Sequence, residues 1–472
     1  MKTICFICEG AYPYVVGGVS AWVHELIRSN PQHRFKVLCI IPNENFAKLK
    51  YQIPKNVIEI KNIIMDPYLN FSYTSVLRDS LYEDEEKKKS ISEMLSFQIN
   101  EGEGKLLEME KVFSKNIGKP LEIILSKEYW NSLLEHYFNH YKKGKFSTYY
   151  WTYRNIILNL LTIGQEKIPE ADIYHSVTTG YAGFVGALAA YRKQGKFLLT
   201  EHGIYPRERE EEILGADWVD KAFKSIWIEY FYFLSQLTYQ YCDKIVSLFE
   251  YNRNIQLQYG APLEKTVVIP NGVDEEIYGN ISFQKKDGFH IGAVLRVVPI
   301  KDIKMMIKGF RMVIDKMPDA KLWIIGPTDE DEEYFEECKD LVENLDMEKY
   351  ITFTGRVDVR EYYSFLDLLL LTSISEGQPL SILEGLSSGI PFIATDVGNC
   401  CEILQGKKEI GEAGLIIPPT SYIALGEALL KLYKNEKKLK EFSENGKKIV
   451  QKYYTKKYFI GQYRKLYEEL GD

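Results

Sequence analysis

The sequence predicts an α/β protein built from two doubly wound, Rossmann-like parallel-sheet domains. Strand-sized apolar segments alternate with helix-sized segments in both halves of the chain, most cleanly from residue 289 onward. The length of 472 residues exceeds what one hydrophobic core usually serves. Glycine or charged residues directly follow several of these strands, as expected at the carboxyl edge of a parallel sheet. We therefore expect one domain over residues 1–280 and a second over residues 281–455.

The composition is that of an ordinary globular enzyme, with 45% hydrophobic and 26% charged residues. A formal net charge of −7 argues against nucleic acid as the main partner. No apolar run approaches the roughly 18 residues that cross a bilayer, and residues 1–10 lead directly into a strand, so we expect a cytoplasmic protein. Its seven cysteines are expected to be reduced, including Cys5 and Cys8, which a strand would place on opposite faces.

The first half begins with a buried strand over residues 2–10, followed by a glycine-bearing loop and a helix that ends at Asn30. Gly17 and Gly18 let backbone approach a ligand, and the helix start behind them favours an anion, although such a pair is as often a plain turn. Further strands are expected over residues 35–42, 172–177, 196–203 and 243–249, and residues 265–278 close the half.

Residues 73–164 break this pattern with long, charged, aromatic-rich helical segments and no β-branched runs, which predicts a helical insertion in the first domain. His136 and His140 lie four residues apart, as metal ligands can, but no third ligand is evident and an aromatic packing face is expected. The segment 141–150 mixes lysine with aromatic residues, which fits a membrane surface, a partner protein or a solvated face.

Two strand ends in the first half carry candidate site residues. His202 follows the strand over residues 196–203 at the edge where active sites form, and His175 ends the preceding strand as a weaker candidate. Arg207 and Arg209 either clamp a phosphate or an acceptor or belong to an exposed, salt-bridged loop. Asn271, in an Asn-Gly turn suited to a linker, is a further candidate contact.

The second half alternates strands and helices throughout, which indicates a parallel sheet covered on both faces. Strands are expected over residues 290–297, 320–326, 350–355, 366–374, 391–397 and 414–419, followed by two final helices. Arg296 and Lys301 lie just past the first of these strands, where two cations suit a diphosphate leaving group.

The segment 375–395 reads as loop, helix and strand after a buried strand. Glu376 opens the loop, Pro379 starts the helix, and Glu384 lies in its second turn. The helix start attracts an anion, whereas carboxylates accept hydrogen bonds from sugar hydroxyls. Together they favour a ligand that carries both phosphate and hydroxyl groups; the alternative is a charged loop and a solvated helix residue.

A competing hypothesis is a metal site at Asp329, Glu330 and Asp331, which form a D-x-D pattern after an apolar strand. Acidic residues continue as far as Glu337. This run is typical of an acidic first helical turn that complements the helix dipole. We therefore expect no metal.

The pattern E-G-x-P-L-S-x-L-E-G, together with R-x-x-x-x-K and N-G-V-D, resembles the retaining glycosyltransferases of family 4, which have the GT-B fold. The resemblance implies that the two domains face a cleft and that the helix over residues 456–472 crosses back onto the first. It implies roles for Glu376 on the donor sugar, Glu384 on the ribose, Arg296 and Lys301 on the diphosphate and His202 beside the anomeric carbon. Asp302 departs from the pattern, because glycine is frequent there. The donor and nucleotide site then comprises Gly17, Gly18, Arg296, Lys301, Glu376, Gly377, Gln378, Pro379, Leu380, Ser381 and Glu384.

Segments of both halves are similar to the Pel exopolysaccharide subgroup of that family. This resemblance implies transfer of a hexose-type sugar from a UDP-sugar to a growing glycan, without a metal or other cofactor. It also implies a cytoplasmic enzyme, peripheral at the inner face of the cell membrane, that works with an inner-membrane polysaccharide synthesis and export complex. Two alternatives stay open: a scaffold that binds sugar nucleotides within such a complex, and a GT-B sugar-nucleotide epimerase.

Overall fold

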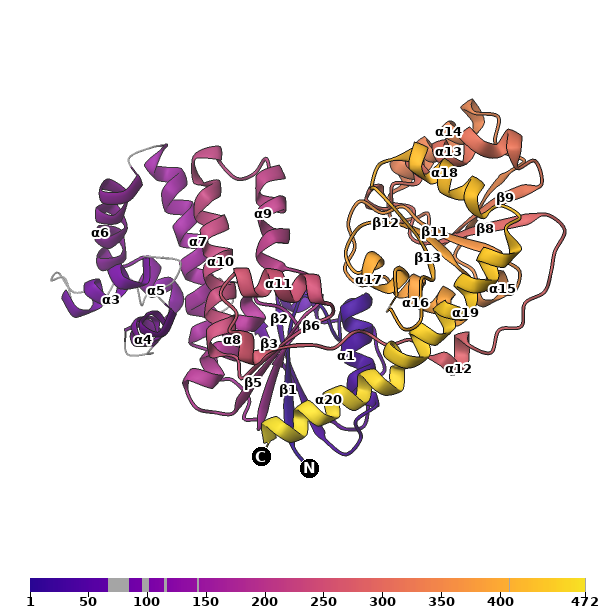
Figure 1. The fold of residues 1–472 in the computed structure, drawn as a ribbon. Helices are drawn as coiled ribbons and strands as arrows, with labels where there is room; N and C mark the ends of the chain where they lie inside the picture. The colour runs from indigo at the N-terminus through magenta and orange to yellow at the C-terminus, as the bar shows by residue number, and fades with distance from the viewer. Residues whose placement is uncertain (67–84, 96–101, 114–116, 142–143, 407, 472) are drawn as a thin grey trace. The chain divides into compact units, whose positions relative to one another are not determined.

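The computed structural model describes residues 1–66, 85–95, 102–113, 117–141, 144–406 and 408–471. The chain falls into two compact units, one formed by Met1–Val268 with Arg464–Asp472 and the other by Ile269–Tyr463 (Figure 1). We call them unit 1 and unit 2. None of the helices in these described ranges is long and apolar enough to cross a membrane.

Unit 1 is organised around a parallel sheet of seven strands in the order β3-β2-β1-β4-β5-β6-β7. The chain order reverses between β1 and β4, and ligands of such sheets bind beyond the carboxyl ends at this point. The strands are β1 (Thr3–Glu9), β2 (Arg34–Ile41), β3 (Val57–Ile64), β4 (Ile173–Ser176), β5 (Lys196–Glu201), β6 (Lys244–Ser247) and β7 (Thr266–Val268).

Helices connect these strands in the alternating manner that the sequence predicts. Helix α8 packs closely on the sheet, because a Cβ atom at its Gly186 would lie 2.1 Å from the ring of Phe197 on β5. Small residues are therefore required on this helix. The connecting helices are α1 (Gly18–Arg28), α8 (Tyr181–Tyr191), α9 (Tyr205–Gly215), α10 (Lys224–Tyr241) and α11 (Glu250–Gln258).

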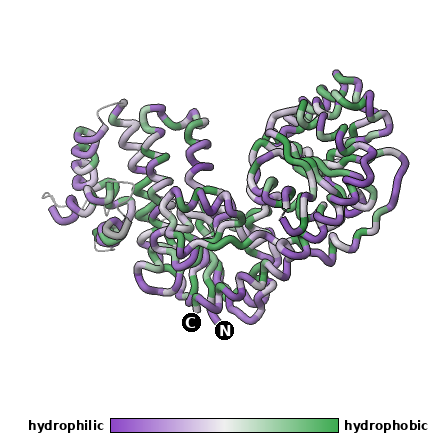
Figure 2. The backbone as a smooth tube through the Cα atoms, viewed as in Figure 1, coloured by the Kyte–Doolittle hydropathy of each residue, from purple (hydrophilic) through white to green (hydrophobic). Residues whose placement is uncertain are grey.

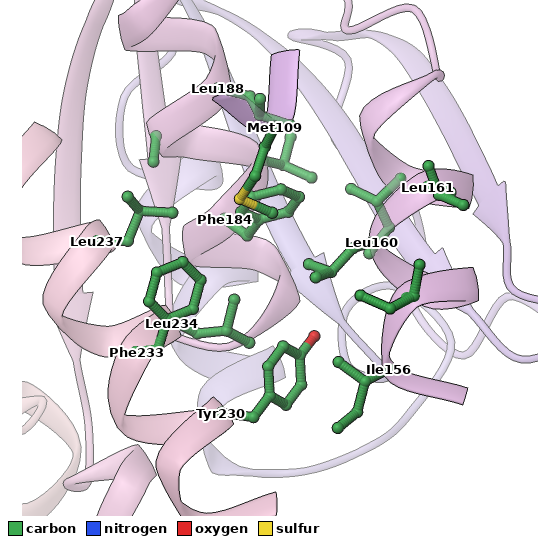
Figure 3. Close-up of a cluster of buried hydrophobic side chains, with 14 of the residues drawn as sticks. Met109, Ile156, Leu160, Leu161, Phe184, Leu188, Tyr230, Phe233, Leu234 and Leu237 are labelled. Atoms are coloured by element: carbon green, nitrogen blue, oxygen red, sulfur yellow. The ribbon is translucent and has the colours of Figure 1, made fainter. Parts of the chain in front are cut away.

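Between β3 and β4 the described residues form only helices. They are α3 (Glu85–Leu95), α4 (Gly102–Phe113), α5 (Pro120–Ile124), α6 (Lys127–His136), a π-helical turn (Tyr137–Tyr141) and α7 (Phe146–Gly164). Their apolar side chains continue the core of the sheet: Met109 and Leu160 meet Phe184 and Leu234 of α8 and α10 (Figure 3). The inserted helices and the sheet therefore share one hydrophobic core.

Unit 2 contains a second parallel sheet, of six strands in the order β10-β9-β8-β11-β12-β13. Figure 2 shows these strands in the hydrophobic colour, and separate buried clusters cover the two faces of the sheet. The strands are β8 (Phe289–Val294), β9 (Ala320–Ile325), β10 (Ile351–Gly355), β11 (Leu368–Leu371), β12 (Phe392–Thr395) and β13 (Gly414–Ile417). The helices are α12 (Glu275–Tyr278), α13 (Ile303–Val313), α14 (Glu332–Asn344), α15 (Val359–Tyr363), α16 (Leu380–Ser387), α17 (Cys400–Leu404), α18 (Tyr422–Leu432) and α19 (Glu436–Tyr453). Two doubly wound parallel sheets confirm the predicted fold class.

The last helix, α20 (Lys456–Gly471), has its final turns in unit 1. There the Arg464 guanidinium donates hydrogen bonds to the side chain of Asn30 at 3.1 Å and to the carbonyl of Ser29 at 2.6 Å. These bonds tie the carboxyl-terminal turns to the end of α1.

All seven cysteines are free thiols, and Cys5 and Cys8 are buried on β1. Burial raises the pKa of the Cys5 thiol to about 12, so it behaves as a small apolar side chain.

Candidate functional site

The loop after β11 is held against the short 3₁₀ turn that follows β8 (Pro299–Lys301). The Ile374 N–H donates to the carbonyl of Ile300 at 2.8 Å, and the Thr372 hydroxyl donates to the carbonyl of Lys301 at 2.9 Å. Both segments lie at the carboxyl edge of the sheet, beyond neighbouring strands. These backbone bonds bring Lys301 to the loop that carries Glu376.

Lys301 and Glu376 form an ion pair in which the ammonium group donates to Glu376 Oε1. The two side chains are only 15% and 11% exposed, so water screens this pair less than a surface pair. The Ser373 hydroxyl donates to the same carboxylate oxygen at 2.6 Å. A cation, a carboxylate and a hydroxyl thus meet immediately before the amino terminus of α16.

Asp302, the residue that departs from the family pattern, has the left-handed backbone conformation, with φ of 46°. Glycine adopts this conformation at no steric cost, which explains why it is frequent there. Asp302 instead serves as the N-cap of α13, where its carboxylate accepts the Met305 N–H at 3.2 Å. The loop that positions Lys301 therefore keeps the geometry that the pattern requires.

Arg296 does not join this cluster. Its guanidinium, on an exposed side chain, donates to Glu330 at 2.7 Å in the loop after β9. Asp329 pairs with Arg356 at 3.2 Å, and Asp331 caps α14 by accepting the Tyr334 N–H at 3.0 Å. Each acidic residue of the D-x-D pattern thus has a partner, and no group of three or more His, Cys, Asp or Glu in the described ranges is placed to hold a metal.

Glu384 lies on α16 beside the hydroxyls of Tyr278 and Tyr363. Burial raises the pKa of its carboxyl to about 7, and these two hydroxyls oppose part of the rise. The carboxylate form is therefore costly in the ligand-free protein, and further hydrogen-bond donors would favour it.

Gln378, at the end of the loop after β11, lies beside Asn271 of the segment between β7 and α12. The Asn271 N–H donates to Gln378 Oε1 at 2.7 Å. Two atoms of this pair, Asn271 Oδ1 and Gln378 Nε2, are buried without a hydrogen-bond partner among the described residues. Unpaired buried polar atoms are rare and often mark a site that binds water or ligand.

In unit 1, His202 follows β5, and the edge of its ring packs against Trp22 of α1 with the ring centres 4.7 Å apart. Burial lowers the pKa of its imidazole to about 4, so the ring is neutral at physiological pH. Its Nε2 is buried and has no hydrogen-bond partner in the part of the chain that the structure describes.

Gly17 and Gly18 begin α1. Gly17 is the N-cap residue, with an extended backbone that any residue adopts. A Cβ atom at either glycine would meet no atom within 4 Å. Packing within the protein therefore does not require glycine here, and the amino end of the helix is open.

The structure places His175, the weaker histidine candidate, in the core of unit 1. It is fully buried, its Nδ1 hydrogen-bonds the Tyr467 hydroxyl and its Nε2 the Thr200 hydroxyl, each at 2.8 Å. Because both ring nitrogens are occupied within the protein, the histidine ties α20 to β5.

Arg207 and Arg209 lie on α9, each paired with a glutamate of the same helix. Arg207 is 3.5 Å from Glu211, and Arg209 is 2.6 Å from Glu212. In the ligand-free structure both arginines form surface ion pairs, which is one of the two alternatives considered from the sequence; the other was contact with a phosphate or an acceptor. Arg207 also borders a pocket of about 400 Å³ between α9 and α11.

Glu201, directly before His202, is a buried charged residue of unit 1 that sequence reasoning missed. Its carboxylate accepts hydrogen bonds from the Tyr239 hydroxyl at 2.7 Å, the Gln256 amide at 2.9 Å and the Tyr205 N–H at 3.2 Å. Burial raises its pKa to about 7, while these bonds lower it. The sequence did carry a sign of its importance, because Glu201 is a charged residue at the end of a largely apolar strand, directly before His202.

Comparison with known proteins agrees with this architecture. Residues 2–264 match the domain of unknown function DUF3492, and residues 274–449 match the glycosyl transferases group 1. The chain is 29% identical over 353 residues to an uncharacterized glycosyltransferase of Methanocaldococcus jannaschii, covering 73% of this chain and 87% of that protein. It is 24% identical over 287 residues to N-acetyl-alpha-D-glucosaminyl L-malate synthase of Bacillus anthracis, covering 58% and 68% of the two chains.

Solved structures share the fold at low sequence identity. Sucrose-phosphate synthase from Thermosynechococcus elongatus superposes with a TM-score of 0.61 at 15% identity, covering 100% of this chain and 99% of its own. HepE of Anabaena in complex with UDP gives a TM-score of 0.63 at 15% identity, covering 99% and 100%. The chain therefore belongs to the DUF3492 family, with a second half that matches the glycosyl transferases group 1 and with the GT-B fold.

Proposed function

We propose that this protein is a retaining, family 4 glycosyltransferase that moves a hexose-type sugar from a UDP-sugar to a growing glycan. The observation that carries the proposal is the meeting of Lys301, Glu376 and Ser373 at the amino end of α16. A UDP-sugar presents both a diphosphate and sugar hydroxyls. The cation and the helix end suit the first, and the carboxylate suits the second.

In the proposed reaction, an acceptor hydroxyl attacks the anomeric carbon from the face that the UDP leaves. The new carbon–oxygen bond forms as the bond to the diphosphate breaks, and the acceptor proton passes to a phosphate oxygen of the leaving group. Negative charge then grows on the diphosphate, where Lys301 and Arg296 act against it. Because these cations belong to the protein, the proposed reaction uses no metal.

Roles for the remaining residues follow the same division of chemistry. Glu376 would accept hydrogen bonds from the hydroxyls of the donor sugar. Glu384 would accept hydrogen bonds from the ribose hydroxyls, which would stabilise its carboxylate form against the effect of burial. The unpaired polar atoms of Asn271 and Gln378 would contact the donor as well. In unit 1, we assign His202 and the Gly17–Gly18 loop to the reacting groups, because Nε2 of His202 is unpaired among the described residues and the helix end is open.

We propose a uridine nucleotide and a hexose as the parts of the donor because similar proteins are associated with them. HepE of Anabaena has been solved in complex with UDP-glucose, and the Bacillus anthracis relative is named for a glucosaminyl product. The Pel-like exopolysaccharide setting rests on the segments around Gly17, His202, Lys301 and Glu376. In that setting the protein works in the cytoplasm, at the membrane face, with a polysaccharide synthesis and export complex.

The test is incubation with UDP-glucose and related UDP-sugars without an acceptor. A transferase releases UDP slowly by hydrolysis or transfer, an epimerase changes the sugar, and a scaffold only binds. Replacing Lys301 with Ala should lower UDP release on the order of 100-fold, because a charge-stabilising group is lost. The matched control is Lys304→Ala, which removes a partly exposed cation of α13 paired with Glu337 and should leave the rate unchanged. Near-normal turnover in Lys301→Ala would refute the assignment.

A further inference from the structure

Six aromatic side chains of α6, the following π-helical turn and α7 form a continuous row of ring contacts. The ring of Trp130 lies 5.4 Å from Phe146 and 5.8 Å from Tyr150, which in turn lies 5.5 Å from Trp151. At the other end of the row, Tyr137 lies 5.2 Å from Phe146 and 5.5 Å from Phe138. We call this set the aromatic face; it consists of Trp130, Tyr137, Phe138, Phe146, Tyr150 and Trp151.

The three largest exposed members of the aromatic face are open to solvent to a degree unusual for such side chains. Trp130 is 47% exposed, Phe138 57% and Trp151 55%. Single exposed apolar residues are common on soluble proteins, but connected patches of large aromatic rings mark interaction surfaces. Because Tyr129, Tyr149 and other buried residues of α6 and α7 pack beneath the face, the helices hold it in place without a partner.

Basic residues surround the aromatic face. Lys127 and Lys145 are exposed, and the partly buried Arg154 places its guanidinium 5.1 Å from the centre of the Trp151 ring. The acidic residues of α6 are already matched by cations of α3: Glu128 lies 3.6 Å from Lys87 and Glu135 2.9 Å from Lys88. On a chain with a net charge of −7, this is a locally basic surface.

We propose that the aromatic face docks the protein onto an anionic lipid surface. Tryptophan and tyrosine prefer the boundary between lipid headgroups and acyl chains, where an apolar ring and a polar edge are both satisfied. Lysine and arginine beside them attract anionic headgroups. An acidic protein partner would also match the cations, but exposed tryptophan rings beside lysine are the combination that suits the headgroup boundary, and vesicle binding separates the two occupants.

This docking is independent of the proposed sugar transfer, because none of its residues belongs to the candidate site. It predicts that the protein floats with vesicles of phosphatidylcholine mixed with phosphatidylglycerol and not with phosphatidylcholine alone. Raised salt should weaken the binding, since the cations and headgroups lie at an exposed surface. No flotation with the mixed vesicles, or equal flotation with both kinds, would overturn the proposal and favour a protein partner.

Variants locate the contact. Phe138→Ser and Trp151→Ser should each weaken vesicle binding about tenfold, because each removes a large ring from the lipid boundary. Lys145→Glu should weaken it through charge alone. The matched control is Tyr422→Ser, an exposed aromatic position on α18 of unit 2 that should bind as the wild type does. Equal loss in the control, or wild-type binding by both ring variants, would contradict the assignment.

Two further measurements separate docking from folding and from catalysis. Thermal unfolding of each variant shows whether the fold is intact. Brominated lipid should quench tryptophan fluorescence in the wild type and less in Trp151→Ser, which a merely destabilised protein would not show. UDP release in the absence of vesicles should be the same in all these variants. A failed docking test would therefore not contradict the proposed sugar transfer, and a failed transfer assay would not contradict the docking.

Discussion

At the scale of single residues, the charged side chains of the ligand-free site form ion pairs with one another. Lys301 and Ser373 both donate to Oε1 of Glu376, which fixes the orientation of the carboxylate before any ligand arrives. Arg296 is held by Glu330. A diphosphate would have to draw Arg296 from an exposed partner and Lys301 from a largely buried one, and exposed pairs cost less to break.

Glu384 gives a pH-dependent prediction, because its pKa is about 7 in the folded protein against an ordinary value of 4.5. Between these values the folded protein keeps a proton that the unfolded chain has lost, so stability falls as pH rises through this window. Glu384→Gln removes the effect. Relative to the wild type, the variant should gain up to about 3 kcal/mol in the free energy of unfolding between about pH 4.5 and pH 8. Urea denaturation of both proteins at the two pH values is the measurement, and a constant difference would contradict it.

The turns that carry Glu376 and Lys301 and the start of α16 were predictable from the sequence, because local signals mark such features well. Residues whose partners lie far along the chain were not predictable in this way. His175 is buried by Tyr467 of the last helix, and Glu201 by Tyr239 and Gln256. A single sequence does not show which distant side chains form hydrogen bonds with a buried polar residue.

At the scale of secondary-structure elements, α13 shows how one residue can serve two local requirements. Asp302 combines a left-handed backbone with an N-cap side chain. Such a conformation costs an ordinary residue roughly 1 kcal/mol, and a lost cap costs about as much again. Glycine avoids the first cost and most of the second.

Two substitutions at this position should therefore differ in their effect on stability. Asp302→Ala should lower the free energy of unfolding of unit 2 by about 1–2 kcal/mol, whereas Asp302→Gly should change it by only a few tenths. Denaturant unfolding followed by circular dichroism measures both. Equal loss in the two variants would show that the aspartate side chain acts through another contact.

At the scale of the whole molecule, the alternation of strands and helices was legible from the sequence in both halves, because each βα unit is a local pattern. The sequence did not predict that the inserted helices share a hydrophobic core with the sheet. Leu160 of α7 packs with Phe184 of α8 and Leu234 of α10, and these residues belong to separate parts of the sequence (Figure 3). Apolar periodicity marks each helix as amphipathic but does not name the surface that it covers.

A shared core predicts that the inserted helices and the sheet of unit 1 unfold together. Leu160→Ala leaves a cavity among fully buried side chains and should cost about 2–5 kcal/mol in the free energy of unfolding. The matched control is Leu107→Ala on α4, where the side chain is 53% exposed and the cost should be small. Hydrogen exchange near the midpoint of unfolding should show amides of α7 and of β1 opening in one step. If α7 opened first while β1 stayed protected, the inserted helices would be a separate folding unit.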